Sequence, residues 1–220
     1  MTDLLVLVHT VPPLIEVFKG LAADLLPGVR VLHVLDEPLL ERVRQRGHLA
    51  EEDALRLGTH VQEAARIGAA AVLVTCSTVS PCVDTMQQQA EIPVLRIDEV
   101  MIREAIVQGR RIGVIATNRT TLEPTRQLLL AEAARTGRQV DVEMVMVEGA
   151  LPALLNGDGA THDRLVRQAV LALAERTDVV VLAQASIARV VPLLGPDALG
   201  IHVLSSPHLA LHQVAQLLKK

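Results

Sequence analysis

The sequence contains the segment Val72-Leu73-Val74-Thr75-Cys76-Ser77-Thr78, an apolar run that ends in small polar residues. A second segment, Val180-Val181-Leu182-Ala183-Gln184-Ala185-Ser186, repeats this pattern later in the chain. Each segment is followed by a stretch compatible with a helix and then by a short apolar run, at residues 92–95 and 201–204. The repetition indicates a duplicated α/β unit with a cysteine in one copy and a glutamine in the other.

The two halves of the chain also begin alike. Leu5-Val6-Leu7-Val8-His9-Thr10 parallels Ile112-Gly113-Val114-Ile115-Ala116-Thr117. We therefore expect two pseudo-symmetric lobes. The first comprises residues 1–97 and the C-terminal helix 206–220, and the second comprises residues 98–205. Because such lobes would place their polar strand ends opposite each other, we expect the functional site in the cleft between them.

Apolar, β-branched runs alternate with longer stretches of helical periodicity, a pattern typical of an α/β fold. The expected strands lie near residues 4–8, 29–35, 71–75, 93–96, 111–116, 139–147, 179–183 and 200–204. The expected helices include 51–68, 81–90, 98–108, 121–135, 161–176 and 207–219. The strands are apolar throughout, as in parallel strands covered on both faces. Each lobe is predicted to contain a mainly parallel four-stranded sheet flanked by helices.

Residues that favour helix N-termini support this assignment. Ser80 is expected to cap a helix that has Pro81 at its first position. The segments 121–124 and 161–163, which combine threonines with acidic residues, are expected to form the first turns of two other helices.

The composition excludes several classes of function. The 220 residues are 50% hydrophobic and 21% charged, with one Phe and no Trp or Tyr, so stacking on bases is not expected. The net charge of −4 argues against a nucleic acid partner. No apolar stretch is long enough to span a membrane, and no signal peptide is recognisable. Two cysteines six positions apart form no disulfide framework, which favours a reducing cytoplasmic location.

The ends of the predicted strands carry small polar residues. In open parallel sheets, ligands bind beyond the carboxyl ends of the strands, where backbone N–H groups and helix dipoles favour anions. A carboxylate suits these groups; a phosphate is the competing ligand, although no glycine-rich phosphate loop is present. The candidate ligand-binding residues are Thr10, Ser77, Thr78, Thr117, Asn118, Thr120, Thr121, Ala185 and Ser186.

The candidate nucleophile is Cys76, because N–H donors between a strand and a helix stabilise a thiolate; we therefore expect a depressed pKa for Cys76 and faster alkylation than for Cys82. The alternative is a small buried core residue, the role that we favour for Cys82. A redox pair of the two cysteines is a further alternative. His9, Glu148 and His208 are candidate acid–base groups, each weighed against a structural role.

Other histidines are expected to be structural: His202 packed in a strand, and His162 among those on helix surfaces or in loops. No His, Cys, Asp and Glu spacing resembles a metal site, so no metal is expected.

Together, these segments resemble the aspartate/glutamate/hydantoin racemase superfamily over nearly the whole chain. The motifs that carry the resemblance are Ala-Val-Leu-Val-Thr-Cys-Ser-Thr at 71–78, Gly-Val-Ile-Ala-Thr-Asn-Arg-Thr-Thr at 113–121 and Val-Val-Val-Leu-Ala-Gln-Ala-Ser at 179–186. The resemblance implies an isomerase that needs no metal or organic cofactor and that moves a substrate proton between two facing cysteines. A small carboxylate is the implied ligand, and a homodimer is left open.

The resemblance assigns roles to residues of this chain. Cys76 matches the first catalytic cysteine, and Ser77 and Thr78 match the carboxylate-binding pair after it. Thr117, Thr120 and Thr121 match the binding loop of the second lobe. Two positions depart from the pattern. His9-Thr10 replaces Asp-Ser, and Gln184 replaces the second cysteine. An amide has no useful proton affinity at neutral pH, so Gln184 cannot serve as the second acid.

Three hypotheses follow from these departures. The chain is an enzyme that uses Cys76 for one-sided chemistry, such as decarboxylation, isomerisation or lyase chemistry, on a small carboxylate or carbonyl compound. Alternatively, it is a true racemase in which another group, such as His208, replaces the missing cysteine. In the third hypothesis it binds a carboxylate without turnover. We favour a changed substrate over a defective amino-acid racemase, because two positions of the cleft have changed together.

Overall fold

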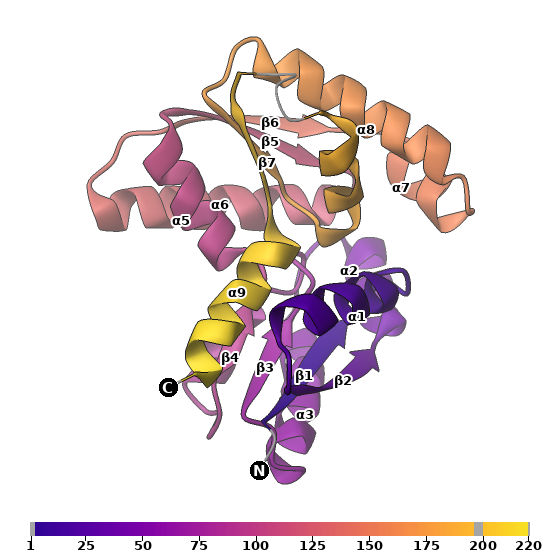
Figure 1. Ribbon diagram of the computed structural model, residues 1–220, viewed down its shortest axis with the longest axis vertical. Helices are drawn as coiled ribbons and strands as arrows, with labels where there is room; N and C mark the ends of the chain where they lie inside the picture. The colour runs from indigo at the N-terminus through magenta and orange to yellow at the C-terminus, as the bar shows by residue number, and fades with distance from the viewer. Residues whose placement is uncertain (1–2, 196–199, 220) are drawn as a thin grey trace. The chain divides into compact units, whose positions relative to one another are not determined.

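The computed structural model describes residues 3–195 and 200–219 (Figure 1). The chain divides into two compact units, Met1–Ile97 with Pro207–Lys220, and Asp98–Ser206. We call these unit 1 and unit 2 and describe each by itself.

Each unit contains a four-stranded parallel sheet, and the two sheets have the same strand order. Unit 1 has the order β2-β1-β3-β4, formed by β1 (Leu4–His9), β2 (Arg30–Leu35), β3 (Ala71–Val74) and β4 (Val94–Arg96). Unit 2 has the order β6-β5-β7-β8, formed by β5 (Arg111–Ala116), β6 (Asp141–Met146), β7 (Val179–Leu182) and β8 (His202–Ser205). The predicted α/β class with two parallel sheets is confirmed.

Helices flank both sheets. The helices of unit 1 are α1 (Leu14–Leu25), α2 (Glu37–Arg46), α3 (Glu51–Arg66) and α4 (Cys82–Gln87), and α9 (Ser206–Leu218) lies almost wholly in this unit. The helices of unit 2 are α5 (Glu99–Gln108), α6 (Arg119–Thr136), α7 (Ala150–Leu155), α8 (Gly159–Ala174) and the 3-10 helix η1 (Ala185–Leu193). The helices named from the sequence pattern did not include α1 or α7, whereas the helix-compatible stretch expected after Gln184 contains η1. None of the described helices is long and apolar enough to cross a membrane.

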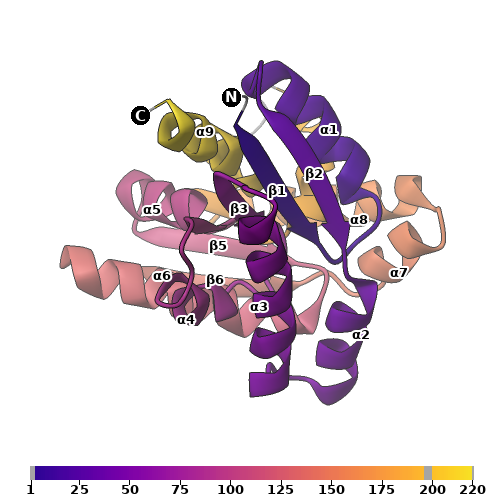
Figure 2. The ribbon, with the colours of Figure 1, turned by 90° about the horizontal axis from the view of Figure 1, so that it is seen from below.

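The two faces of the unit 1 sheet are covered by different helices. Val6 and Val8 of β1 pack into an apolar cluster with Leu57 of α3 and with residues of α2 and α4. His9, on the alternate face of the same strand, contacts Phe18 of α1, with ring centroids 5.4 Å apart. Figure 2 shows α1 and α3 on opposite sides of this sheet.

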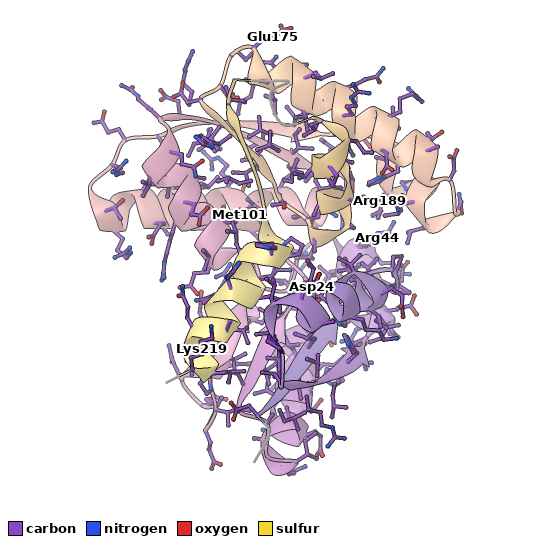
Figure 3. All side chains as sticks on the ribbon, viewed as in Figure 1. Asp24, Arg44, Met101, Glu175, Arg189 and Lys219 are labelled. Carbon is purple, nitrogen blue, oxygen red and sulfur yellow. The ribbon has the colours of Figure 1, made fainter. Side chains whose placement is uncertain are left out.

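In unit 2, β5 and β7 are buried between helices. Ile115 and Leu182 pack against α7, α8 and η1 in one apolar cluster. On α5 the side chain of Met101 is fully buried, whereas Arg189 on η1 is exposed (Figure 3). The edge strand β6 is only half-buried and begins at the exposed Asp141, so the expectation of strands that are apolar throughout is wrong for this strand.

Three expected helix starts are placed differently by the structure. The hydroxyl of Ser80 donates to the carbonyl of Cys76 at 3.2 Å, and Pro81 occupies the N-cap of α4. Helix α6 begins earlier than expected, because Asn118 supplies its N-cap. Helix α8 begins at Gly159, where the side chain of Asp158 accepts from the N–H of Thr161 at 3.0 Å. Asn118 and Asp158 cap α6 and α8 through side-chain hydrogen bonds, so these helices begin before the threonines that were expected to start them.

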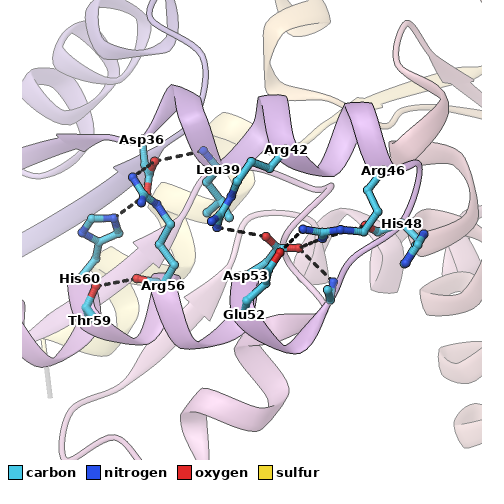
Figure 4. A network of polar contacts seen from close by, with 11 residues as sticks. Asp36, Leu39, Arg42, Arg46, His48, Glu52, Asp53, Arg56, Thr59 and His60 are labelled. Carbon is cyan, nitrogen blue, oxygen red and sulfur yellow. Dashed lines mark hydrogen bonds and ion pairs between the residues drawn. The ribbon is translucent and has the colours of Figure 1, made fainter.

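Two buried carboxylates hold α2 and α3 together in unit 1 (Figure 4). Asp36 caps α2 through the N–H of Leu39 and accepts from Arg56 at 2.7 Å and 2.8 Å, while His60 Nε2 lies 2.8 Å from its Oδ2. Asp53 receives a second set of hydrogen bonds from Arg42, from Arg46 and from the N–H of Ala50. The hydrogen bonds from Arg56 and His60 overcome the opposing effect of burial and lower the pKa of Asp36 to about 2.

Candidate functional site

The carboxyl end of the unit 1 sheet brings Thr10 and Cys76 side by side. Val8 and Val74 form the last register pair between β1 and β3, and Thr10 and Cys76 each follow two residues later. Both residues are buried, with 2% and 8% of their surface exposed. Together with Ser77 and Thr78 they form what we call the first strand-end cluster. The structure therefore brings these four predicted site residues together.

Unit 2 repeats this arrangement. Ile115 and Leu182 form the last register pair between β5 and β7, and Thr117 and Gln184 each follow two residues later. Gln184 thus holds the same position in unit 2 that the cysteine holds in unit 1. With Asn118, Ala185 and Ser186, these two residues form what we call the second strand-end cluster.

The backbone turns sharply after Cys76. The carbonyl of Cys76 accepts from the N–H of Val79 at 3.2 Å, and from the N–H and the hydroxyl of Ser80 at 3.0 Å and 3.2 Å. The N–H groups of Thr78 and Val79 also act to lower the pKa of the Cys76 thiol, the direction that stabilises a thiolate.

Burial raises the pKa of the Cys76 thiol above its ordinary value. Hydrogen bonds act in the opposite direction. They come from the side chain of Thr10, the N–H of Val79, and the N–H and side chain of Thr78. The expectation of a depressed pKa is wrong for this structure, because the cost of desolvating a thiolate exceeds what these donors return. The donors are nonetheless arranged around the sulfur.

Two hydroxyls in the first strand-end cluster are buried without full hydrogen bonding. Ser77 is 4% exposed, and within the described ranges its Oγ has no partner; Thr10 Oγ1 likewise has no nitrogen or oxygen partner there. The hydroxyl of Thr10 approaches the sulfur of Cys76 instead. Buried hydroxyls are normally paired, so these two have unused capacity for a ligand.

Cys82 differs from Cys76. It occupies the first position of α4, although it packs in the apolar cluster that also contains Cys76, Val83 and Met86. Burial, reinforced by the charge of Asp53, raises its pKa to about 11. These surroundings agree with the structural role expected for Cys82.

His9 lies at the end of β1, as expected, but on the face opposite to the apolar cluster that contains Cys76. Its Nδ1 is 2.8 Å from Thr75 Oγ1, and its Nε2 is 2.9 Å from His33 Nδ1. Burial, with the neighbouring His33, lowers the pKa of His9 to about 4. His9 is therefore a neutral, hydrogen-bonded histidine, and the structure does not bring it into the first strand-end cluster.

In the second cluster, Gln184 is anchored to the end of β5. Its Oε1 accepts from the backbone N–H of Thr117 at 2.5 Å and from the Thr117 hydroxyl at 3.1 Å. Asn118 is buried and caps α6 by accepting from the N–H of Thr120 at 3.4 Å. Ala185 is buried and Ser186 half-buried at the start of η1. Thr121 is buried in the first turn of α6.

Two predicted acid–base groups are exposed. Glu148 follows β6 but is 65% exposed and forms an ion pair with Arg119 at 2.6 Å. His208 is exposed on α9, and its ring meets that of His212 edge-on at 4.6 Å.

Sequence reasoning missed Ser206. Leu182 and Ser205 form the last register pair of β7 and β8, so Ser206 lies beside the residue that precedes Gln184. Ser206 is fully buried, and its hydroxyl has no partner within the described ranges. The signal was present, because Ser205-Ser206-Pro207 also places hydroxyls at the end of an apolar strand.

Two other histidines depart from expectation. His202 is the first residue of β8 but is exposed rather than packed. His162 is fully buried in the first turns of α8, not on a surface, and its Nδ1 lies 2.8 Å from Asp163. Across residues 3–195 and 200–219, no group of three or more His, Cys, Asp and Glu side chains could hold a metal ion.

Comparison with known proteins places this arrangement in a family. The model of the Asp/Glu/hydantoin racemases matches residues 14–214. No curated protein is significantly similar in sequence.

Among solved structures, a glutamate racemase isoform from Bacillus anthracis is similar with a TM-score of 0.76 at 18% identity, covering 99% of this chain and 82% of that one. An allantoin racemase from Klebsiella pneumoniae gives 0.74 at 18% identity, with 99% and 88% covered. An aspartate racemase homologue from Pyrococcus horikoshii gives 0.71 at 12% identity over the full length of both chains. The match over residues 14–214 confirms the resemblance seen in the sequence, and the chain belongs to the Asp/Glu/hydantoin racemase family.

Proposed function

We propose that this protein is an enzyme that moves a proton at the carbon next to a small carboxylate, using Cys76 and no metal or organic cofactor. The observation that carries the proposal is the set of donors around the Cys76 sulfur, from Thr10, Thr78 and Val79. An inert core cysteine needs no such donors, whereas a thiolate base does.

The proposed reaction begins with ligand binding at the first strand-end cluster. The buried hydroxyl of Ser77 and the groups of Thr78 would hold the substrate carboxylate. The thiolate of Cys76 takes the proton from the neighbouring carbon, and the electron pair passes into the carboxylate, where these donors stabilise the added charge. Return of a proton from the thiol to the same face of that carbon gives exchange, and return to a neighbouring carbon gives isomerisation. In elimination the electron pair instead expels a leaving group from the next carbon, and in decarboxylation the thiol protonates the carbon that has lost CO2.

The second strand-end cluster would supply binding rather than acid–base catalysis. In unit 2, Gln184 occupies the position that corresponds to Cys76, and an amide has no useful acid or base strength at neutral pH. A two-base racemisation of aspartate or glutamate therefore lacks its second base. We propose one-sided chemistry on a small carboxylate or carbonyl compound, of which decarboxylation, isomerisation and elimination are the candidate outcomes.

Solvent deuterium exchange tests this proposal. The protein is incubated in D2O with a panel of small mono- and dicarboxylates, hydroxy acids and amino acids, and exchange at the carbon next to the carboxylate is followed by NMR. Exchange that is lost in Cys76→Ala and kept in Cys82→Ala supports the proposal. Exchange that survives Cys76→Ala overturns it.

A carboxylate-binding protein without turnover is the second candidate. The raised pKa of the Cys76 thiol favours it, because a protonated thiol is a poor base. Binding of a carboxylate at micromolar concentration, with no deuterium exchange over days, would establish this alternative.

A further inference from the structure

We infer that Gln184 selects ligands that present a hydrogen-bond acceptor, a carboxylate or carbonyl oxygen, to its amide nitrogen. The inference deepens the proposed function and rests on it for the place where the ligand binds. It concerns specificity, and its test measures binding without any turnover.

The orientation of the Gln184 amide is fixed by Thr117. A backbone N–H can only donate, and that of Thr117 lies 2.5 Å from Oε1 of Gln184. The hydroxyl of Thr117 donates to the same oxygen at 3.1 Å. A flipped amide would set two donors against each other, so the oxygen must face Thr117 and the NH2 group must point elsewhere.

The NH2 group of Gln184 is then available to a ligand. Gln184 is half-buried, and no hydrogen bond from its Nε2 occurs among the described residues. It also does not cap its own helix, since its side chain makes no hydrogen bond to the first turn of η1. A second donor lies nearby. Ser206 comes directly after β8, the strand beside β7, and its buried hydroxyl has no partner in the described ranges.

This arrangement distinguishes between substrate groups. The acceptor of Gln184 is already used twice by Thr117, so a ligand ammonium placed there would meet N–H donors and gain nothing. An oxygen placed there would accept a hydrogen bond from the amide. A site that offers donors discriminates strongly against a ligand that lacks the matching acceptor. Gln184 therefore favours a ligand that presents a carboxylate or carbonyl oxygen to its amide over one that presents an ammonium group.

Gln184→Glu separates the two halves of the side chain. A glutamate keeps the oxygen that accepts from Thr117 and keeps the length of the side chain, but it cannot donate. Calorimetric binding of succinate and aspartate is measured in a Cys76→Ala background, with and without Gln184→Glu. Gln168→Glu, which adds the same charge on the exposed face of α8, is the matched control.

We expect the Cys76→Ala protein to bind succinate more tightly than aspartate. Gln184→Glu is expected to weaken succinate binding about tenfold or more without lowering the melting temperature. Gln168→Glu should leave binding unchanged. The inference is overturned if Gln184→Glu binds succinate as well as its parent does, if aspartate binds more tightly than succinate, or if neither probe binds. Binding as expected, combined with no deuterium exchange in the wild type, would instead count against the proposed function alone.

Discussion

The side-chain oxygen of Gln184 accepts hydrogen bonds from both the backbone N–H and the hydroxyl of Thr117. The equivalent pair in unit 1 is Thr10 and Cys76, where the threonine hydroxyl approaches a thiol. The same pair of strand ends therefore supports a potential base in one unit and a fixed amide in the other. This difference decides which chemistry the duplicated fold can perform.

Replacing the amide by a thiol tests this difference directly. We expect Gln184→Cys to lower the native deuterium exchange about tenfold or more, because the ligand loses a donor and Thr117 loses its acceptor. We also expect no gain in racemisation of aspartate or glutamate, which chiral chromatography measures. Robust racemisation of either amino acid by the unmodified protein would contradict the assignment.

The donors around Cys76 should control its reactivity. Thr10→Val removes a hydroxyl that stabilises the thiolate, so the pKa of Cys76 should rise further and its alkylation should slow. Iodoacetamide labelling from pH 7 to 10, followed by mass spectrometry, measures this. Labelling of Cys82, whose pKa is about 11, should be unaffected. Equal labelling rates for Cys76 in the wild type and in Thr10→Val would show that the Thr10 hydroxyl does not stabilise the thiolate.

The His9–His33 contact should make stability depend on pH. Burial lowers the pKa of both imidazoles, to about 4 for His9, so the folded state holds them neutral while the unfolded chain protonates near pH 6.5. The stabilisation is complete above pH 6.5 and is lost as the pH falls towards 4. For His9 it amounts to about 3 kcal/mol at most.

Urea unfolding at pH 7.5 and pH 4.5 measures this effect. The free energy of unfolding should fall between the two values in the wild type and change less in His9→Asn. The exposed His212→Ala serves as the control and should keep the wild-type slope. An unchanged slope in His9→Asn would show that His9 is not the titrating group.

Asp36 should matter more to stability than an exposed carboxylate. Asp36→Asn leaves the Arg56 guanidinium without its buried partner and should destabilise the protein by about 2 kcal/mol at pH 7. Because the folded pKa is about 2, this contribution should vanish as the pH falls from about 4 to 2. Asp141→Asn, at an exposed pair with Arg110, should change little. Similar losses in both variants, from thermal melts, would contradict this.

Much of the fold could be predicted from the sequence because its signals are local. The apolar runs at 4–8, 71–75, 111–116 and 179–183 are each buried between helices and match β1, β3, β5 and β7 to within one residue at either end. Helices α1 and α7 were not among the expected helices; α7 is only six residues long, and tertiary packing is needed to stabilise so short a helix. The half-buried β6 escaped the expected apolar pattern because an edge strand faces solvent.

The sequence by itself determined the duplicated α/β architecture, the strand ends that carry polar residues, and the pairing of a cysteine with a glutamine. Only the tertiary structure decided what those residues experience. Burial raises the pKa of Cys76 although hydrogen-bond donors act to lower it. The register of β5 and β7 places the Gln184 oxygen next to the N–H of Thr117. The alternation of side chains along β1 places His9 on the face that packs against Phe18. Burial, register and side-chain direction depend on segments distant in sequence, which local patterns do not encode.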